Sequence, residues 1–222
     1  MKSFGWVYTF LAALLIPYFI MMGAIRILMT PLFLRYEYLK PGFPADPYGL
    51  TTQDRLQWAP YALNYLLNDA GISYLGDLTF PNGTPLFNER ELSHMVDVKA
   101  VVQLGLQVWT VDIAVLLLLA LIAFLTHRGG AYLRGLSIGG WITVGIILLI
   151  LVAVFTNFDA LFATFHQLFF ASGSWLFYYS DTLIRLFPLP FWSDGFTLMG
   201  ILSTLGGLLF GIGGRALSKR FG

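Results

Sequence analysis

The chain contains no cysteine, and charged residues make up only 11% of it. The absence of thiols excludes disulfides, thiolate metal sites, a cysteine nucleophile and lipidation of the protein itself. With a formal net charge of +1 and no basic run interleaved with aromatic residues, we expect no nucleic-acid partner. The patterns G-x-x-x-x-G-K-[ST] and G-x-G-x-x-G are also missing, so we expect no nucleotide partner and no cofactor.

Hydrophobic residues are the abundant class, at 57% of the chain. Too few polar side chains remain to cover a water-facing surface, so lipid must cover part of it. A helical span needs about 20 mainly apolar residues, and four stretches qualify: 4–29, 100–126, 133–155 and 196–214. The sequence therefore predicts an all-α membrane protein with four transmembrane helices in a single membrane domain, 1–222. The glycines of the fourth stretch predict close helix packing in lipid.

Basic residues mark the N-terminus, the turn between the second and third spans, and the C-terminus. They are Lys2, Arg128, Arg134, Arg215, Lys219 and Arg220, and none of these short segments holds an acidic residue. Positively charged flanks face the cytoplasm. Both termini are therefore predicted to be cytoplasmic, and loops 30–99 and 157–194 to form a mainly helical extracytoplasmic cap.

The first of these loops carries two helix-start signals. Thr51 with Asp54 predicts a capping box ahead of an amphipathic run that reaches Leu67, with a break expected at Pro60. Asn88 with Glu91 predicts a second cap, which opens a helix running on into the second span.

The second loop, 157–194, is as apolar as the spans but is interrupted by Gly173, Pro188 and Pro190, and it is crowded with aromatic residues. Aromatic rings concentrate at the headgroup level of membranes. We therefore expect one or two short helices at the outer membrane interface.

The main chemical signal is a pair of histidines, one in each extracytoplasmic loop. On a helix, Glu91, His94 and Asp97 form a polar stripe one turn apart. A carboxylate near a histidine can orient its ring and stabilise its imidazolium form. An ordinary solvated helix face is the plain alternative.

His166 lies among aromatic residues, in the stretch Phe-His-Gln-Leu-Phe-Phe. A charged ring is costly in such a setting, so a lowered pKa is expected, which suits a general base near neutral pH. The alternative is a structural histidine bonded to a backbone carbonyl.

Two further arrangements are weaker. Asp112 lies well inside a span, 18 residues after His94 and about 27 Å along the axis, and is read as a protonated or hydrogen-bonded structural residue. Two histidines with a carboxylate could hold a metal, but there is no H-E-x-x-H, and the single Glu-x-x-His lacks the second copy that a di-iron bundle needs. We therefore expect no metal.

Three segments resemble the lipoprotein intramolecular transacylase (Lit) family of bacterial membrane proteins. They are Glu-Leu-Ser-His-Met-Val-Asp-Val-Lys at 91–99, Phe-His-Gln-Leu-Phe-Phe at 165–170 and Asp-Thr-Leu-Ile-Arg-Leu-Phe-Pro at 181–188, together with Trp175. The resemblance implies an enzyme that moves the sn-2 acyl chain of a diacylglyceryl lipoprotein onto the α-amine of its N-terminal cysteine, giving lyso-form lipoprotein. It also implies that the functional histidines fall on His94 and His166.

The chemistry of the residues themselves is compatible with this activity. Ester-to-amide transfer is downhill, and both groups sit on one molecule, so binding supplies proximity without a nucleotide. We expect His166 to act as the base and His94, backed by Asp97 or Glu91, as its partner, with Trp175 and Arg185 binding substrate. The site would lie at the outer leaflet of the bacterial cytoplasmic membrane, with lipoprotein and phospholipid as partners. A non-catalytic membrane scaffold or lipid-binding protein, or an acyl hydrolase, remains the alternative.

Overall fold

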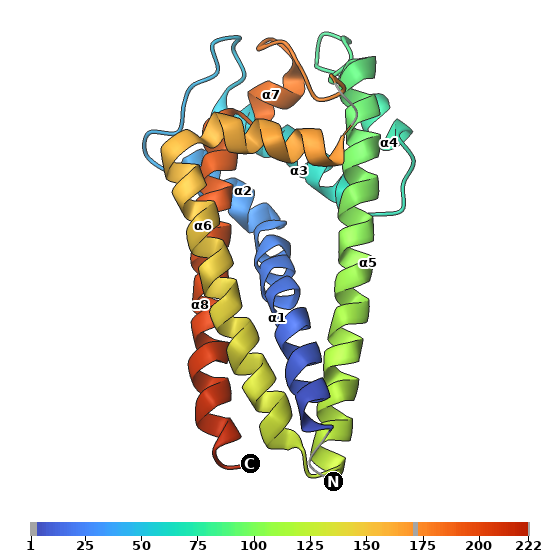
Figure 1. The fold of residues 1–222 in the computed structure, drawn as a ribbon. Helices are drawn as coiled ribbons and strands as arrows, with labels where there is room; N and C mark the ends of the chain where they lie inside the picture. The colour runs from blue at the N-terminus through green and yellow to red at the C-terminus, as the bar shows by residue number, and fades with distance from the viewer. Residues whose placement is uncertain (1–3, 171–172, 222) are drawn as a thin grey trace. The chain divides into compact units, whose positions relative to one another are not determined.

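The computed structural model describes residues 4–170 and 173–221, so Lys2 lies outside the described residues. Within them the chain forms helices and, besides these, an isolated β-bridge between Thr79 and Pro85. In chain order the helices are α1 (Gly5–Leu28), α2 (Pro31–Leu39), α3 (Thr52–Leu67), α4 (Ser73–Gly76), α5 (Glu89–Leu125), α6 (Gly129–Phe169), α7 (Thr182–Leu186) and α8 (Leu189–Ser218) (Figure 1).

Four of the helices are long and apolar enough to cross a membrane, namely α1, α5, α6 and α8. The prediction of an all-helical chain with four spans is therefore confirmed. The bounds of α1 agree with the predicted first stretch, whereas the other three helices extend beyond their apolar parts. In particular, α5 starts at Glu89 and continues into the span, as the cap signal at Asn88 indicates.

The chain divides into two compact units. The first unit comprises Met1–Ile27, Gly105–Thr156 and Phe196–Gly222, and the second comprises Leu28–Leu104 and Asn157–Gly195. The expectation of a single membrane domain over 1–222 stays a prediction, as does the cytoplasmic placement of the termini.

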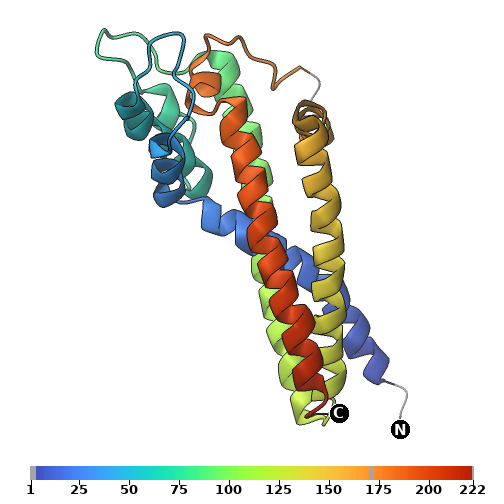
Figure 2. The ribbon, with the colours of Figure 1, turned by 90° about the vertical axis from the view of Figure 1, so that its left-hand side faces the viewer.

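The first unit is packed through small residues that bring helix backbones together. A Cβ atom on Gly140 of α6 would lie 2.5 Å from the Gly207 carbonyl oxygen of α8 and 2.5 Å from the Gly211 nitrogen. Ser137 adds a hydroxyl that donates to the Gly211 carbonyl at 2.6 Å. Figure 2 shows these parts of α6 and α8 alongside each other. The predicted close packing by the glycines of the fourth span is confirmed.

Asp112 lies in the first unit and is only 5% exposed. Neither of its carboxyl oxygens has a hydrogen-bond partner among the described residues. Of the two roles expected for Asp112, the hydrogen-bonded one is not observed among the described residues, and the protonated one stays a prediction.

The second unit has its own core, formed by apolar side chains of α2, α3, α4 and α7 with the loops between them. Its most deeply buried apolar members include Ala59, Leu75, Leu86 and Leu186. The capping box at the start of α3 is present, since Thr51 and Asp54 exchange side-chain and backbone hydrogen bonds. The break expected at Pro60 is wrong: α3 continues through it to Leu67. Burial of Ala59, Ala62 and Leu63 in this core offsets the backbone hydrogen bond that proline cannot donate.

The aromatic loop 157–194 contains the expected short helices. Asn157 has non-helical dihedral angles (φ −158°, ψ 80°) inside α6, and its side-chain oxygen accepts from the Ala160 backbone nitrogen at 3.1 Å. Asn157 thus caps a fresh helical segment, 158–169, which we call the α6 end segment. The short helix α7 follows at Thr182–Leu186.

Candidate active site

Both histidines of the predicted pair lie in the second unit. His94 belongs to the first turns of α5, where residues 89–99 carry Glu89, Arg90, Glu91, Asp97 and Lys99 before the apolar run begins. His166 lies in the last turn of the α6 end segment, beyond the break at Asn157. The cap at Asn88 fixes the start of α5 and hence the position of His94. The break at Asn157 fixes the direction of the α6 end segment and hence the position of His166.

The two imidazole rings face each other within one aromatic enclosure. Their centroids are 6.1 Å apart, and their planes are inclined by 23°. Phe170 contacts both rings, with its centroid 5.0 Å from His94 and 5.5 Å from His166. Phe177 closes the side of His94 at 5.3 Å, and Trp175 closes the side of His166 at 5.0 Å.

The tautomer of His166 is fixed by the backbone. Its Nδ1 lies 2.8 Å from the Phe162 carbonyl oxygen, which can only accept a hydrogen bond. Nδ1 therefore carries the proton in the neutral ring, and Nε2 keeps its lone pair as an acceptor. Burial lowers the pKa of His166, and the bond to Phe162 partly opposes that shift. The lowered pKa keeps the ring neutral at neutral pH, so the Nε2 lone pair can accept a proton as a general base.

His94 is more deeply enclosed, at 5% exposed. Burial lowers its pKa from 6.5 to about 4; a charge on His166 acts in the same direction, while the carboxylate of Asp97 opposes it. Nδ1 of His94 is buried and has no hydrogen-bond partner among the described residues. His94 is therefore neutral and has an unoccupied ring nitrogen.

Glu91 is committed to the backbone rather than to His94. Its Oε1 accepts from the Leu183 nitrogen at 2.6 Å, and its Oε2 accepts from the Asn88 nitrogen at 2.8 Å. Asn88 returns the bond through its Oδ1 to the Glu91 nitrogen at 3.1 Å, which completes the predicted cap. Burial raises the pKa of Glu91, although these backbone bonds favour its charged form. The carboxyl group thus joins the start of α5 to α7.

Trp175 presents an unused donor at the site. Its indole Nε1 is buried and has no acceptor among the described residues, although a buried indole N–H usually finds a partner. The same residue lines a cavity of about 320 Å³ together with Gln167, Phe170, Gly173 and Leu176. Because Phe170 and Trp175 also contact His166, this cavity adjoins the histidine pair.

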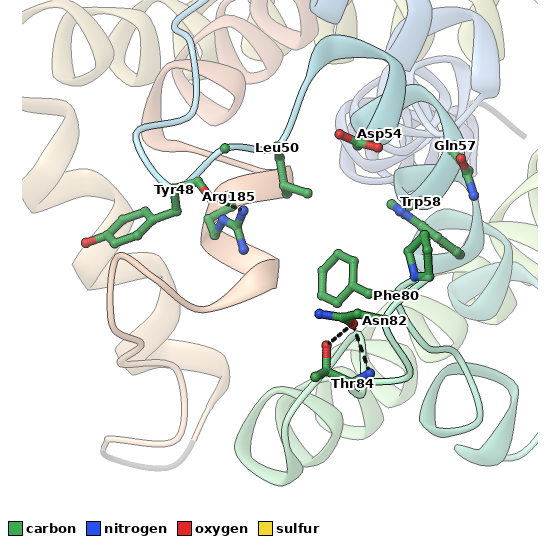
Figure 3. A pocket seen from close by; sticks show the side chains of 11 residues that line it. Tyr48, Leu50, Asp54, Gln57, Trp58, Phe80, Asn82, Thr84 and Arg185 are labelled. Atoms are coloured by element: carbon green, nitrogen blue, oxygen red, sulfur yellow. Dashed lines mark hydrogen bonds between the residues drawn. The ribbon is translucent and has the colours of Figure 1, made fainter.

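Arg185, the other predicted substrate-binding residue, lies at a different cavity. Its Nε and Nη2 contact Asp46 Oδ2 at 3.1 and 3.0 Å, and Nη2 also donates to the Tyr48 carbonyl at 3.1 Å. Among the described residues, no hydrogen bond, ion pair or ring contact joins Arg185 to either histidine. Figure 3 shows Arg185 on the wall of this second cavity, of about 380 Å³.

A metal centre would need further ligands at the histidine pair. Among residues 4–170 and 173–221, no three histidine, aspartate or glutamate side chains gather closely enough to hold one ion. The pair therefore offers ring nitrogens for proton transfer and hydrogen bonding.

The sequence model of the family described as "Lipoprotein intramolecular transacylase Lit" matches residues 10–192. The chain belongs to the Lit family. A relative from Aquifex aeolicus (strain VF5), described as an uncharacterized protein, is 33% identical over 211 residues, covering 94% of this chain and 93% of the relative. The resemblance drawn from the three sequence segments is thus confirmed.

Solved Lit structures share the fold. The membrane-integral lipoprotein intramolecular transacylase Lit from Bacillus cereus superposes with a TM-score of 0.77 at 18% identity, covering 99% of this chain and 98% of that one. A variant of the Bacillus Lit with one histidine replaced by arginine gives a TM-score of 0.71 at 19% identity, covering 96% and 92%. Membership of the Lit family and the four apolar helices make this chain a multi-pass membrane protein.

Sequence reasoning missed the residues that enclose the Lit histidines. Phe170 and Phe177 appear in the sequence only as members of a long aromatic run, and nothing in their spacing singles them out. Arg90 was missed too: it pairs with Asp181 at 2.7 Å and lies over the ring of Tyr178 at 4.8 Å. It thereby anchors the loop that carries Phe177 against His94. A charged residue in a helix start gives no signal for such a long-range contact.

Proposed function

We propose that this protein transfers the sn-2 acyl chain of a diacylglyceryl lipoprotein to the α-amine of the lipoprotein's own N-terminal cysteine. The observation that carries the proposal is the enclosed histidine pair, at 6.1 Å, in a member of the lipoprotein intramolecular transacylase family. In one ring of that pair, the Nδ1 contact with the Phe162 carbonyl leaves Nε2 as the acceptor nitrogen of the neutral form. The product is the lyso-form lipoprotein, which bears a free sn-2 hydroxyl and an N-acyl cysteine.

The reaction balances without a further reactant. The neutral amine attacks the ester carbonyl, and a C–N bond forms as the carbonyl becomes a tetrahedral oxyanion. The intermediate then loses one proton from nitrogen, and the C–O bond to glycerol breaks while the glyceryl oxygen gains a proton. Because donor and acceptor are held on one molecule, the enzyme contributes orientation and proton transfer.

His166 is the group we assign to both proton transfers. Its Nε2 accepts the proton from nitrogen, and the resulting imidazolium delivers it to the glyceryl oxygen. Sequence reasoning expected His94 to act as the partner of His166. With a pKa of about 4, however, only about a thousandth of His94 is protonated at pH 7. We therefore assign His94 the role of a neutral hydrogen-bonding partner that holds the reacting groups beside His166.

The remaining site residues support this pair. Trp175 is the proposed donor to the oxyanion, because its buried N–H has no other acceptor among the described residues and its ring adjoins His166. Asp97 favours a positive charge on His94. Glu91 positions the start of α5 against α7 through its two backbone bonds.

We further propose that the termini are cytoplasmic and that loops 30–99 and 157–194 face outward in one membrane domain, 1–222. The reaction would then take place at the outer leaflet of the bacterial cytoplasmic membrane. The basic flanks that support this orientation include Arg134 and Arg220. Membrane phospholipid would surround the spans.

The test is mass spectrometry of the N-terminal peptide of a reporter lipoprotein incubated with the purified protein in liposomes. We expect conversion from the diacylglyceryl to the N-acyl, lyso form with the wild type, and a loss of at least about 10²-fold with His166→Ala or His94→Ala. His127→Asn is the matched control, because His127 is an exposed turn residue with φ 56°, which asparagine tolerates.

Two results would redirect the assignment. Release of free fatty acid without N-acyl peptide would make the protein an acyl hydrolase. No conversion by folded wild type, in liposomes that hold the reporter, would leave a scaffold or lipid-binding role.

A further inference from the structure

The cavity beside Arg185 lies wholly within the second unit and plays no part in the proposed chemistry. It is lined by residues of the loop before α3, of α3 itself, of the turn around Asn82 and of α7. Its lining comprises Tyr48, Gly49, Leu50, Asp54, Gln57, Trp58, Phe80, Pro81, Asn82, Thr84 and Arg185 (Figure 3). At about 380 Å³ it has room for one or two amino-acid side chains with their backbone.

The wall of this cavity combines aromatic rings with amide groups. Trp58 and Phe80 form an edge-to-face pair with centroids 6.4 Å apart. The Asn82 side-chain oxygen is occupied by Thr84, at 2.8 and 3.1 Å, so the Asn82 NH2 group remains available to donate. Gln57 is exposed and supplies a second amide. Rings beside free amide groups suit an uncharged ligand that both stacks and forms hydrogen bonds.

The charges of the wall disfavour a phosphate-bearing ligand. Arg185 is paired with Asp46 at 3.0 Å, and Asp54 contributes a further carboxylate. A phosphate headgroup would meet a cation that is already paired with Asp46 and a second carboxylate, that of Asp54. A peptide segment, whose backbone is neutral and rich in donors and acceptors, meets no such penalty.

Helix α7 connects this cavity to the histidine pair. The Leu183 nitrogen of α7 bonds to Glu91, which lies one turn before His94, and Arg185 follows two residues after Leu183. With about 1.5 Å of rise per helical residue and the lengths of the side chains, the path from His94 to the cavity is roughly 15 Å. An extended polypeptide advances about 3.3 Å per residue, so roughly five residues span that path.

We propose that this cavity binds the polypeptide of the lipoprotein substrate about five residues after its lipidated cysteine. The inference rests on the proposed function, because it places the substrate's cysteine at the histidine pair. The polypeptide that follows the cysteine must extend away from the histidine pair. The cavity binds this segment through ring and amide contacts. Binding energy from this remote segment holds the amine and ester in register at the histidines.

The test compares synthetic diacylglyceryl-cysteine peptides that carry one to eight residues after the cysteine, each assayed in liposomes with wild-type protein. We expect kcat/KM to rise about tenfold between two and six residues and then to level off. Gln57→Trp places an indole in the cavity from an exposed helix position. We expect it to reduce the ratio of kcat/KM for six-residue peptides to kcat/KM for two-residue peptides to near one. Gln53→Trp is the matched control: Gln53 is exposed on the same helix but does not line the cavity.

A second measurement uses the unaltered protein. A photo-crosslinking residue at the fifth position of the peptide is expected to label the tryptic segments that contain Trp58 or Phe80. Three results would each overturn the inference without contradicting the transacylase activity. They are transfer that does not depend on peptide length, a length dependence that Gln57→Trp leaves unchanged, and labelling confined to other segments. Absence of transfer with every peptide would overturn the proposed function, and this inference with it.

Discussion

The two units of the molecule are stabilised in different ways. In the first, helix backbones approach through glycine, and side-chain hydroxyl and indole groups bond to backbone carbonyls, as Tyr18 does to Gly105 at 2.8 Å and Trp109 does to Phe19 at 3.0 Å. The second unit instead contains the ion pairs Lys40–Glu37, Lys40–Asp194, Arg90–Asp181 and Arg185–Asp46, both helix caps and both site histidines.

This difference follows from the surroundings that each unit meets. Apolar spans gain little by burying apolar side chains against one another in lipid, so close backbone contact and hydrogen bonds supply their association. The second unit must order loops rich in polar groups, and it does so through caps and charge pairs. The first unit should therefore be sensitive to added volume, and the second to changes of single polar atoms.

The largest expected effect is on the backbone contacts of the first unit. Gly140→Leu places a side chain where the Gly207 carbonyl and the Gly211 nitrogen each lie only 2.5 Å from a Cβ. The helices must separate, so we expect loss of monodisperse, folded protein in size-exclusion and thermal-unfolding measurements. Gly145→Leu is the control on the same helix, because nothing lies within 4 Å of its Cβ. Equal tolerance of both changes would remove the distinction drawn between the units.

The next effect concerns the indole N–H of Trp175, in the second unit. Trp175→Phe keeps an aromatic ring beside His166 but removes the N–H, so kcat should fall about 10²- to 10³-fold with little change in KM. The melting temperature should not fall, since the lost donor has no partner among the described residues.

Trp192→Phe provides the comparison for that experiment. The Trp192 indole already donates to the Phe187 carbonyl at 3.1 Å, so its loss should affect stability rather than kcat. Full activity in Trp175→Phe would show that the oxyanion has another donor.

A smaller effect is expected at Glu91. Glu91→Gln leaves only one acceptor oxygen for the backbone nitrogens of Asn88 and Leu183, so one N–H then faces an amide NH2. The cost should be about 1–3 kcal/mol in the free energy of unfolding, followed by denaturant titration. Glu89→Gln, at an exposed position two residues earlier, is the control. If Glu91→Gln instead abolished turnover without loss of stability, Glu91 would be a proton carrier and not a positioning residue.

The last effect is a pH dependence set by His94, which develops only at acidic pH. Its pKa in the folded protein, about 4, lies below the ordinary value of 6.5. Between these two values the unfolded chain binds more protons, so stability is expected to fall as the pH drops through that window. NMR of isotope-labelled imidazole should place the His94 midpoint well below 6.5, and Asp97→Asn should lower it further because a favourable negative charge is lost. A midpoint at or above the ordinary value would mean that the aromatic enclosure is open to water.

Much of this arrangement is readable in the sequence where the signal is local. The apolar runs predict the four spans, and the pairs Thr51–Asp54 and Asn88–Glu91 predict helix starts, because both depend on neighbours within one turn. Pro60 misleads, since local chemistry favours a break while tertiary packing preserves α3.

The candidate site shows where local reasoning ends. Glu91 and His94 share a helix face, yet the Glu91 carboxylate bonds to Leu183, a partner 92 positions away. The enclosure of His94 by Phe177 depends in the same way on the ion pair between Arg90 and Asp181. Sequence periodicity does not predict such long-range contacts. The histidines could therefore be identified from the sequence, whereas the residues that surround them could not.

The bond between His166 and the Phe162 carbonyl has an evolutionary consequence. Where a neighbouring side chain sets the tautomer of a histidine, a single codon change can remove that bond. Here the orienting atom belongs to the main chain, and every residue type at position 162 would supply it. Substitutions at position 162 should therefore keep the orientation of the His166 ring, while they change the ring contact that Phe162 makes with it at 4.1 Å.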